Sequence, residues 1–254
     1  MPLVIGMEAA GVVEALGEGV ERFRLGDHVA YASRPLGSYR DLRNFPAERC
    51  VALPAGISDR DAAAGLLKGL TVQMLVRRVF RVAPGAWAVF HSAAGGVGRL
   101  AGQWLRAIGA ARAAGYEAVF VRGRDDWPAR VRELSGGGVP VVYDPVGRET
   151  WEGSLSCLAP RGHLVCFGNS SGLVPPFSVN VLRDRGSLSL SWVPFGDYTA
   201  DPTDSRLRRG SCSTRSPAGA LRPAAPRCLS LAQAAEAHRL LESGRTTGTL
   251  VLVP

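Results

Sequence analysis

A glycine-rich turn is the part of this sequence whose residue types and spacing point most directly to chemistry. It reads Ala93-Ala94-Gly95-Gly96-Val97-Gly98 and lies between the apolar run WAVFHSA and the amphipathic stretch VGRLAGQWLRAIGA. The pattern matches the dinucleotide turn G-x-G-x-x-G with alanine at the first position. There Gly95 would let the backbone approach a pyrophosphate, Gly98 would let the helix pack closely on the strand, and N–H groups would face the anion. The turn therefore predicts a nucleotide site, the alternative being a tight strand-to-helix connection without a ligand.

The hydrophobic pattern contains the elements that would position this turn. In residues 58–80 the apolar residues recur at spacings of three and four, with Ser58 and Asp59 placed to cap a helix at its start. Beyond the turn, a helix can end at Gly109. Short apolar runs then alternate with helical stretches: AVFV, DDWPARVRELSGGG, VPVVYD, a helix near residues 149–157, HLVCFG and SLSLSWV. Strands that alternate with helices of this length predict an α/β fold whose parallel sheet is covered on both faces.

Segments of a different character flank this alternating region. Residues 1–53 consist of short alternating stretches broken by Gly and Pro, which predicts a small β-rich unit. Residues 199–229 are rich in Ser, Arg, Pro, Gly and Ala without periodicity, so we expect a loop or disorder there. A strongly amphipathic helix, LAQAAEAHRLLESG, and a final strand, TLVLV, follow this segment.

Composition and charge exclude several classes of protein. Of the 254 residues, 46% are hydrophobic and 20% are charged, as in an ordinary globular protein. No apolar run reaches the roughly 18 residues needed to span a bilayer, and the start MPLVIGMEAAG lacks the pattern of a signal peptide. We therefore expect a cytoplasmic protein. The net charge of +8 is concentrated in residues 205–229, where arginines without interleaved aromatic residues would bind nucleic-acid phosphates only non-specifically.

The cysteines predict neither a disulfide framework nor a zinc site. They are five in number and far apart, without a C-x-x-C pair and without a histidine at ligand spacing: Cys50, Cys157, Cys166, Cys212 and Cys228. We therefore interpret them as free thiols.

A ribose-binding acid is the next feature that a dinucleotide site requires. It stands about 20 residues after the turn, at the end of the second strand, and Glu117 has that position by count. Only about eight residues separate Gly109 from the run AVFV, however, which is too few for a further strand and helix. We therefore do not assign this role to Glu117, and we infer that a segment is missing between Ala110 and Gly115.

Longer stretches of the sequence carry a resemblance to a known family. They are GMEAAGVVEALGEGV, GDHVAYA, LKGLTVQMLVRR, FHSAAGGVGRLAGQW, VVYDPVGRETWEGSL, FGNSSG and LESGRTTGTLVLVP. Together they resemble quinone oxidoreductases of the zeta-crystallin type, in the medium-chain dehydrogenase/reductase superfamily. The resemblance implies a partial GroES-like β domain in residues 1–75 and a Rossmann domain, with a doubly wound parallel sheet that lacks one strand, in residues 76–200. Residues 201–230 are then an irregular segment, and residues 231–254 form a helix and a strand that return to the first domain.

The same resemblance implies an enzyme, an NADPH:quinone oxidoreductase that transfers a hydride without zinc. Met7 stands where zinc-containing relatives have a histidine, and reduction of related activated carbonyls or alkenes is an open alternative. No acid–base residue is expected, since the cofactor supplies the hydride. The quinone is the small-molecule partner, and a homodimer is expected through the edge strand SLSLSWV.

The cofactor-binding residues implied by the resemblance come from five parts of the chain. Thr71 would lie near the nicotinamide, and Gly95, Gly96 and Val97 would hold the pyrophosphate. The remaining cofactor surface would be made by Phe167, Gly168, Asn169, Ser170, Val193 and Arg245. Three of these have simpler interpretations, since Thr71 could bond its own helix backbone, Phe167 could be a core aromatic and Arg245 a solvated turn cation.

The sequence also departs from the family. Family members have residues before the position of Met1, and their second Rossmann strand, with the basic residue that contacts the 2′-phosphate of NADPH, has no counterpart here. Residues 205–229 do not resemble the family. We therefore expect weak NADPH binding, and a catalytically silent or defective relative that acts at most as a binding protein remains the alternative.

Overall fold

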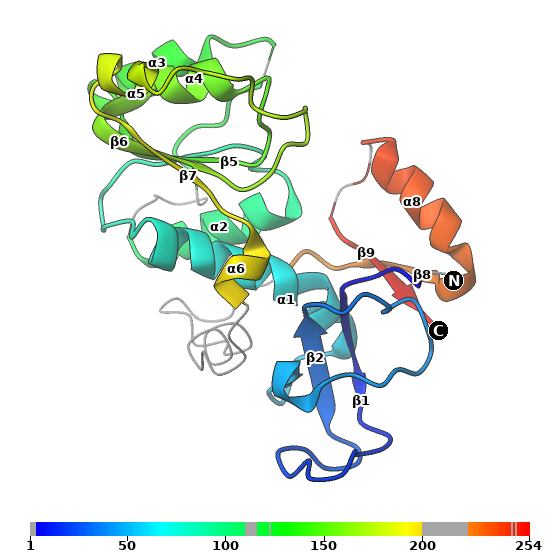
Figure 1. Ribbon diagram of the computed structural model, residues 1–254. Helices are drawn as coiled ribbons and strands as arrows, with labels where there is room; N and C mark the ends of the chain where they lie inside the picture. Colours follow the sequence, from blue (N-terminus) through cyan, green and yellow to red (C-terminus); the bar gives the residue numbers. More distant parts are fainter. Residues whose placement is uncertain (1–3, 110–115, 122, 200–222, 245, 247) are drawn as a thin grey trace. The chain divides into compact units, whose positions relative to one another are not determined.

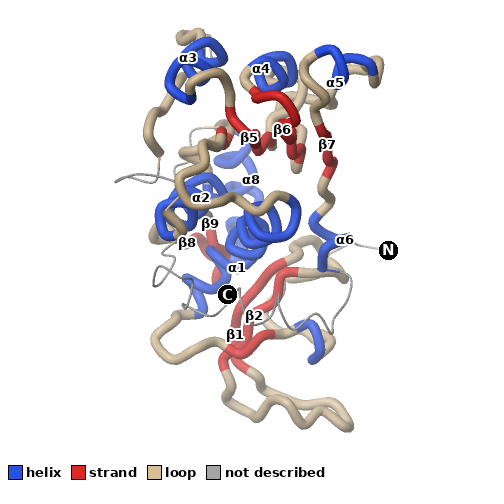
Figure 2. The backbone as a smooth tube through the Cα atoms, turned by 90° about the vertical axis from the view of Figure 1, so that its left-hand side faces the viewer, coloured by secondary structure: helices blue, strands red, loops and turns tan. Residues whose placement is uncertain are grey.

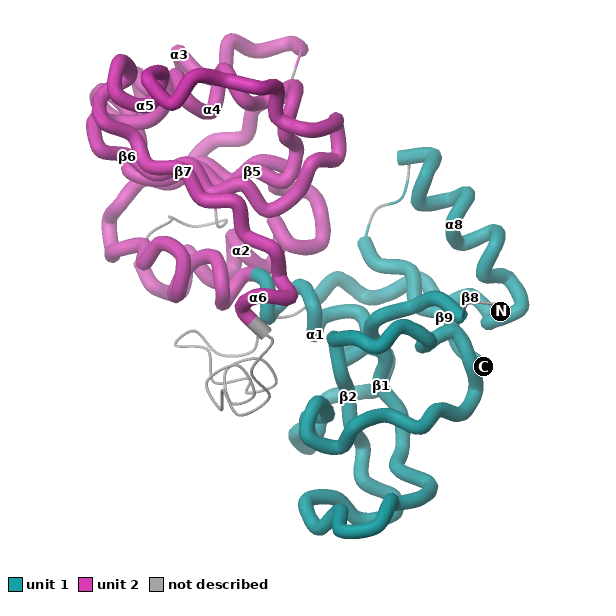
Figure 3. The backbone as a smooth tube through the Cα atoms, viewed as in Figure 1, with its two compact units in different colours: residues 1–71, 199–254 teal, residues 72–198 magenta. Residues whose placement is uncertain are grey.

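The computed structural model describes residues 4–109, 116–121, 123–199, 223–244, 246 and 248–254 (Figure 1). These residues form two compact units (Figure 3). One unit comprises Met1–Thr71 together with Thr199–Pro254, and the other comprises Val72–Tyr198. We call them unit 1 and unit 2 and describe each by itself.

Unit 1 contains two small sheets. Strands β1 (Glu8–Val12), β2 (His28–Ala32) and β3 (Val51–Ala52) form an antiparallel sheet in that order, with Glu8 opposite Ala32. A short 3-10 helix, η1 (Ala47–Arg49), precedes β3. Strands β8 (Arg227–Ser230) and β9 (Leu250–Val253) pair in parallel, joined through η3 (Leu231–Gln233) and α8 (Ala234–Glu242). The predicted β-rich start and the predicted final helix and strand are thus confirmed.

One boundary of the irregular segment is wrong. The sequence predicts irregular structure as far as residue 230, whereas β8 begins at Arg227. The strand forms because its backbone groups pair with β9, an interaction between distant residues that local composition does not show. Residues 200–222 lie outside the described residues.

The predicted helix at residues 58–80 is confirmed, with a change of type near its end. Helix α1 (Asp59–Gln73) starts after Ser58, whose hydroxyl accepts a hydrogen bond from the Asp61 N–H at 3.1 Å. It continues into the π-helix η2 (Met74–Val79). The hydroxyl of Tyr143 donates to the Phe80 carbonyl at 3.1 Å, and this bond satisfies a backbone acceptor beside the buried end of η2 within unit 2.

Unit 2 is built on a parallel sheet of four strands in the order β4-β5-β6-β7. The strands are β4 (Val89–Phe90), β5 (Val139–Asp144), β6 (Leu158–Cys166) and β7 (Ser189–Trp192). Helices α3 (Trp127–Ser135), α4 (Trp151–Ser156) and α5 (Asn180–Asp184) cover one face, while α2 (Gly96–Ala107) lies on the other (Figures 1 and 2). Helix α6 (Phe195–Thr199) ends the unit. The predicted α/β class and the covered parallel sheet are confirmed.

The strand predicted at AVFV is wrong. Residues 118–121 belong to no strand, and in the described part of the chain the sheet ends at β4. A strand is stable only when its N–H and C=O groups form hydrogen bonds with a neighbouring strand. In the described structure, no strand pairs with residues 118–121. The apolar run therefore forms no strand in the described structure.

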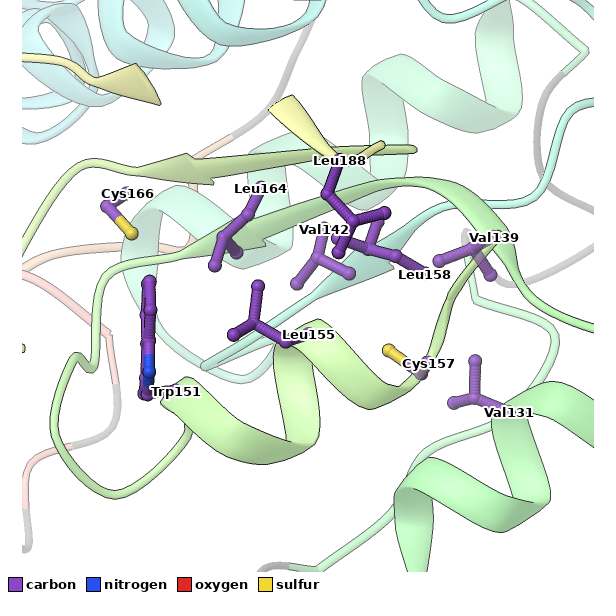
Figure 4. Close-up of a cluster of buried hydrophobic side chains, with 10 residues drawn as sticks. All are labelled: Val131, Val139, Val142, Trp151, Leu155, Cys157, Leu158, Leu164, Cys166 and Leu188. Atoms are coloured by element: carbon purple, nitrogen blue, oxygen red, sulfur yellow. The ribbon is translucent and has the colours of Figure 1, made fainter. Parts of the chain in front are cut away.

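The core of unit 2 lies between the sheet and the helices α3 and α4. Trp151 and Leu155 project from α4 towards the strands (Figure 4). The residues of this cluster are at most 7% exposed: Val131, Val139, Val142, Trp151, Leu155, Cys157, Leu158, Leu164, Cys166 and Leu188. Two thiols are part of this cluster, and burial raises the pKa of both Cys157 and Cys166 from 9.0 to about 12.

These two thiols make the stability of the protein sensitive to alkaline pH. Between about pH 9 and pH 12 the unfolded chain loses the two protons while the folded chain keeps them, so the free energy of unfolding should fall as the pH rises. The expected slope is about 1.4 kcal/mol per pH unit for each thiol. Burial also raises the pKa of Cys50, to about 11, so three thiols contribute to the slope at pH 9–10. Urea unfolding at pH 8, 9 and 10 measures the slope, and Cys157→Ala should remove about a third of it. A free energy that stays flat above pH 9 would contradict the burial of these thiols.

Candidate functional site

The residues predicted to bind a cofactor in unit 2 all follow the carboxyl ends of its strands. Because the strands are parallel, Phe90, Asp144, Cys166 and Trp192 end at the same edge of the sheet. The glycine turn follows β4, the loop of residues 167–172 follows β6, and Val193 follows β7. In open α/β sheets this edge is where ligands bind. The fold thus brings residues 95–97, residues 167–170 and Val193 to one edge of one sheet.

The glycine turn has the strand–turn–helix structure that its pattern predicts. Ser92 adopts a left-handed backbone conformation with φ 57°, and its carbonyl accepts a hydrogen bond from the Gly95 N–H at 2.9 Å. Helix α2 begins directly afterwards, with Gly95 as its N-cap. At Gly98 a Cβ atom would lie 2.4 Å from the Ser92 carbonyl oxygen and 2.7 Å from the Ala93 Cα atom. Only glycine therefore allows the first turn of α2 to pack this closely on the loop.

The start of α2 has the electrostatics of an anion site. The N–H groups of the first helical residues have no acceptor within the helix, and the helix dipole places partial positive charge there. The first turn carries no acidic residue, and no side chain caps it. Gly95 is exposed, and Gly96 and Val97 are partly exposed, so these groups can be reached from solvent. Arg99 donates from Nε to the Ala94 carbonyl at 2.9 Å, which holds an exposed cation beside the turn.

The loop after β6 is fixed against the loop after β5. The Phe167 N–H donates to the Asp144 carbonyl at 3.0 Å, and the Ser170 N–H donates to the Pro145 carbonyl at 3.2 Å. A Cβ atom on Gly168 would lie 2.8 Å from that same Pro145 oxygen. Asn169 and Ser170 are exposed at the edge of the sheet and can offer hydrogen bonds to a ligand.

Two of the predicted residues are less accessible. The ring of Phe167 lies 5.7 Å from that of Phe90, so its packing inside unit 2 matches the simpler interpretation of a core aromatic. Val193 is 2% exposed, and its N–H donates to the Cys166 carbonyl at 2.8 Å. A ligand could therefore meet Val193 only through its remaining backbone groups.

A buried carboxylate at the same edge of the sheet was not predicted from the sequence. Asp144, at the end of β5, is 1% exposed and accepts four hydrogen bonds: from the N–H of Val146 at 2.7 Å and of Gly147 at 3.1 Å, and from the hydroxyls of Thr150 at 2.7 Å and Ser154 at 2.8 Å. It thereby fixes the loop on which residues 167–170 rest. The signal in the sequence was an Asp directly before the turn residues Pro145, Val146 and Gly147.

A histidine lies next to this carboxylate. His91 follows β4, is 8% exposed, and has Nε2 2.9 Å from the Ser154 hydroxyl oxygen. Its ring packs edge-on against Trp127 at a centroid distance of 4.8 Å. His91 therefore links the glycine turn to the Asp144 network.

The two remaining predicted site residues are Thr71 and Arg245. Thr71 belongs to unit 1, and its Oγ1 donates to the Leu67 carbonyl at 2.8 Å, which is the simpler interpretation given above. Arg245 lies outside the described residues. Glu117 is described and exposed, and it is part of no strand.

Metal-binding clusters and membrane-spanning helices are both absent from the described residues. No three His, Cys, Asp or Glu side chains of this part of the chain gather where they could hold a metal ion. Within the same residues, no helix has the length and the apolar character needed to cross a bilayer.

Comparison with known families and proteins places the whole chain. Residues 1–76 match the alcohol dehydrogenase GroES-like domain, and residues 109–252 match a family described as zinc-binding dehydrogenase. A quinone oxidoreductase of Pseudomonas aeruginosa is 41% identical, over 100% of this chain and 83% of its own length. A 2-haloacrylate reductase of a Burkholderia species is 34% identical, over 100% of this chain and 81% of its own. The first alignment spans 269 positions, so that relative carries residues that this chain of 254 lacks.

Solved structures agree with these matches. The structure of Escherichia coli quinone oxidoreductase complexed with NADPH superposes with a TM-score of 0.90 at 37% identity, and the match covers 98% of this chain and 82% of that one. The similarity therefore extends over both units and not over the glycine turn alone.

Proposed function

This chain belongs to the quinone oxidoreductase family of the medium-chain dehydrogenases/reductases, and on that premise we propose that it is an NADPH-dependent quinone reductase. The observation that carries the proposal is the start of α2, where unpaired N–H groups follow a turn that only glycine at position 98 allows. When bound, NADPH supplies the hydride that reduces the quinone. The protein binds the cofactor, orients it and limits the access of water to it.

We assign the binding roles by position along the sheet edge. The backbone N–H groups of Gly96 and Val97, with Gly95 before them, would hold the pyrophosphate. Phe167, Gly168, Asn169 and Ser170 would form the neighbouring surface, to which Val193 would add backbone groups. Thr71 near the nicotinamide and Arg245 in the last motif complete the proposal. In the same proposal, residues 1–75 and 231–254 form the GroES-like domain and residues 76–200 the Rossmann domain.

The described residues offer contacts for the pyrophosphate of NADPH but not for the 2′-phosphate on its ribose. The described residues contain no strand between α2 and α3 to carry a contact to the 2′-phosphate. We therefore predict that NADPH binds, and that it is preferred over NADH by less than about tenfold in Kd, which corresponds to less than about 1.4 kcal/mol. Titrations of the two cofactors under the same conditions measure this ratio. A preference of hundredfold or more would show that a specific 2′-phosphate contact exists.

Turnover distinguishes this function from the alternative of a silent binding protein. Purified protein is mixed with NADPH and 1,4-benzoquinone, and loss of the NADPH absorbance band is followed, with samples lacking protein or quinone as controls. We expect consumption of NADPH that is proportional to protein concentration. A folded sample that binds NADPH without consuming it would support the silent relative, which the high identity over the whole chain does not favour.

We also propose that the protein is a cytoplasmic homodimer. Strand β7 is an edge of the sheet in the described structure, and its outward N–H and C=O groups could pair with a second copy. Sedimentation of the purified protein tests this, and a monomer at micromolar concentration would contradict it.

A further inference from the structure

A cavity of about 610 Å³ lies along β4, and Val139 at the start of β5 also contributes to its lining. Residues 85–94 line one of its walls and residues 116–121 line another. Leu105 of α2 contributes on one face of the sheet, and Trp127, Val131 and Leu134 of α3 contribute on the other. We call this cavity the edge slot. It lies within unit 2, and at one end its lining includes Ala93 and Ala94, the first two residues of the glycine turn.

The backbone of β4 offers unused hydrogen-bonding groups to the edge slot. The His91 N–H donates to the Tyr143 carbonyl of β5 at 3.0 Å, and Phe90 lies opposite Tyr143 in the parallel ladder. Groups on alternate residues of a strand point to opposite edges. The N–H and C=O groups of Ala88 and Phe90 therefore point away from β5, and among the described elements the sheet has no strand beyond β4.

The opposite wall of the edge slot is held in place at both of its ends. The Tyr116 hydroxyl donates to the Gly98 carbonyl at 2.5 Å, and its ring packs so closely on Gly102 that a Cβ atom there would lie 2.7 Å away. The Val121 N–H donates to the Asp125 carboxylate at 2.7 Å. Between these anchors, residues 117–120 belong to no helix or strand, and Glu117 forms a bend. The wall is thus positioned, with backbone groups available along it.

Apolar side chains around the edge slot are unusually exposed. Trp87 is 36% exposed, Leu134 39%, Val121 50% and Val119 72%, and all four line the cavity. Burying these surfaces would stabilise a complex by about 25 cal/mol for each Å² of apolar area removed from water. An occupant must therefore be apolar towards α2 and α3 and must carry hydrogen-bonding groups towards the two walls.

We propose that the edge slot binds an extended, apolar peptide segment of about five residues, which adds to β4 as a further strand. A peptide strand has N–H and C=O groups on its two edges and side chains on its two faces, which is the distribution that the walls of the edge slot require. Strands buried on both faces are rich in Val, Ile and Leu, so the segment is expected to be a continuous run of such residues. A flat apolar molecule would cover the side chains but leave the backbone groups of Ala88 and Phe90 unpaired and buried, at a cost in free energy.

The first test uses a synthetic peptide and the full chain. The probe is five alternating Val and Ile residues with one Lys at each end, acetylated and amidated; the control peptide is N-methylated at alternate residues and cannot form the ladder. Tryptophan fluorescence, to which Trp87 and Trp127 of the edge slot contribute, reports binding, and hydrogen exchange of individual amides reports where it occurs. We expect saturable binding of the probe, at least tenfold weaker binding of the control, and at least tenfold slower exchange at Ala88 and Phe90. The Leu190 amide, on the outward side of β7, should be unchanged.

Matched variants separate the edge slot from the rest of the surface. Val119 and Val179 are 72% and 71% exposed, and only Val119 lines the cavity. Val119→Asn should raise the Kd of the probe peptide at least fivefold, whereas Val179→Asn should leave that Kd unchanged. Ala88→Pro removes an N–H that β5 does not use and should abolish protection at Phe90. Equal affinity of the two peptides, or equal effects of the two Asn variants, would overturn the proposal, as would a folded protein that does not bind the probe.

Discussion

Replacing Asp144 by alanine is expected to lower the free energy of unfolding by roughly 3–6 kcal/mol, because four buried donors lose their acceptor at once. The carboxylate is 1% exposed, so water cannot take its place without a rearrangement of the loop after β5. Urea unfolding measured at neutral pH gives the difference directly. The same variant should weaken NADPH binding, since residues 167–170 rest on the loop that Asp144 organises.

Two further variants control this result. Asp144→Asn keeps one carbonyl oxygen for the N–H groups of Val146 and Gly147 and should lose about half as much stability. Asp184→Ala removes an aspartate whose side chain is 60% exposed and paired with Arg183 on the surface, and should change stability by no more than about 0.5 kcal/mol. A loss of less than about 1 kcal/mol for Asp144→Ala would contradict the network.

The second large effect is expected at Gly98. In Gly98→Ala the new Cβ atom would lie 2.4 Å from the Ser92 carbonyl oxygen and 2.7 Å from the Ala93 Cα atom. These are backbone atoms, which cannot move away by a change of rotamer. Helix α2 must then move away from the turn, which displaces the N–H groups proposed to hold the pyrophosphate. Loss of one or two charge-assisted hydrogen bonds to the pyrophosphate costs about 1.5–3 kcal/mol each, so we expect the Kd for NADPH to rise at least about tenfold.

The control for Gly98 is Gly196 of α6, where an added Cβ atom meets nothing within 4 Å. Gly196→Ala should leave NADPH affinity unchanged and should stabilise the helix by up to about 1 kcal/mol. Circular dichroism and thermal melting verify that both variants are folded. A Gly98→Ala protein that is folded and binds NADPH as tightly as the original would show that the turn does not position the cofactor.

Local signals in the sequence predicted the turn and its flanks correctly. The run WAVFHSA, the glycines and the amphipathic stretch after them specify β4, the turn and α2 through contacts between near neighbours. The helix at residues 58–80 was equally visible in its spacing, although nothing in the pattern distinguishes its α-helical part from the π-helix at Met74–Val79. Membership in the quinone oxidoreductase family was carried by several stretches together, and the full-length matches confirm it.

Features that depend on distant partners were predicted poorly. The run AVFV has the composition of a strand but forms none, because no described strand lies beside it, whereas residues 227–230 pair with β9 despite an unpromising composition. The role of Asp144 could not be predicted for the same reason, because it depends on which residues the fold brings together. Its four donors come from the next turn and from α4, and a sequence alone does not show that all of them converge on one carboxylate.

The role of the glycine turn in cofactor binding is tested by a titration of the purified protein with NADPH, followed by cofactor fluorescence and, on the same samples, by hydrogen exchange at Gly96 and Val97. We expect saturable binding, with exchange at these two amides slowed at the start of α2. A folded protein that shows no saturable binding, or that binds NADPH without any protection of Gly96 and Val97, would contradict this role of the turn.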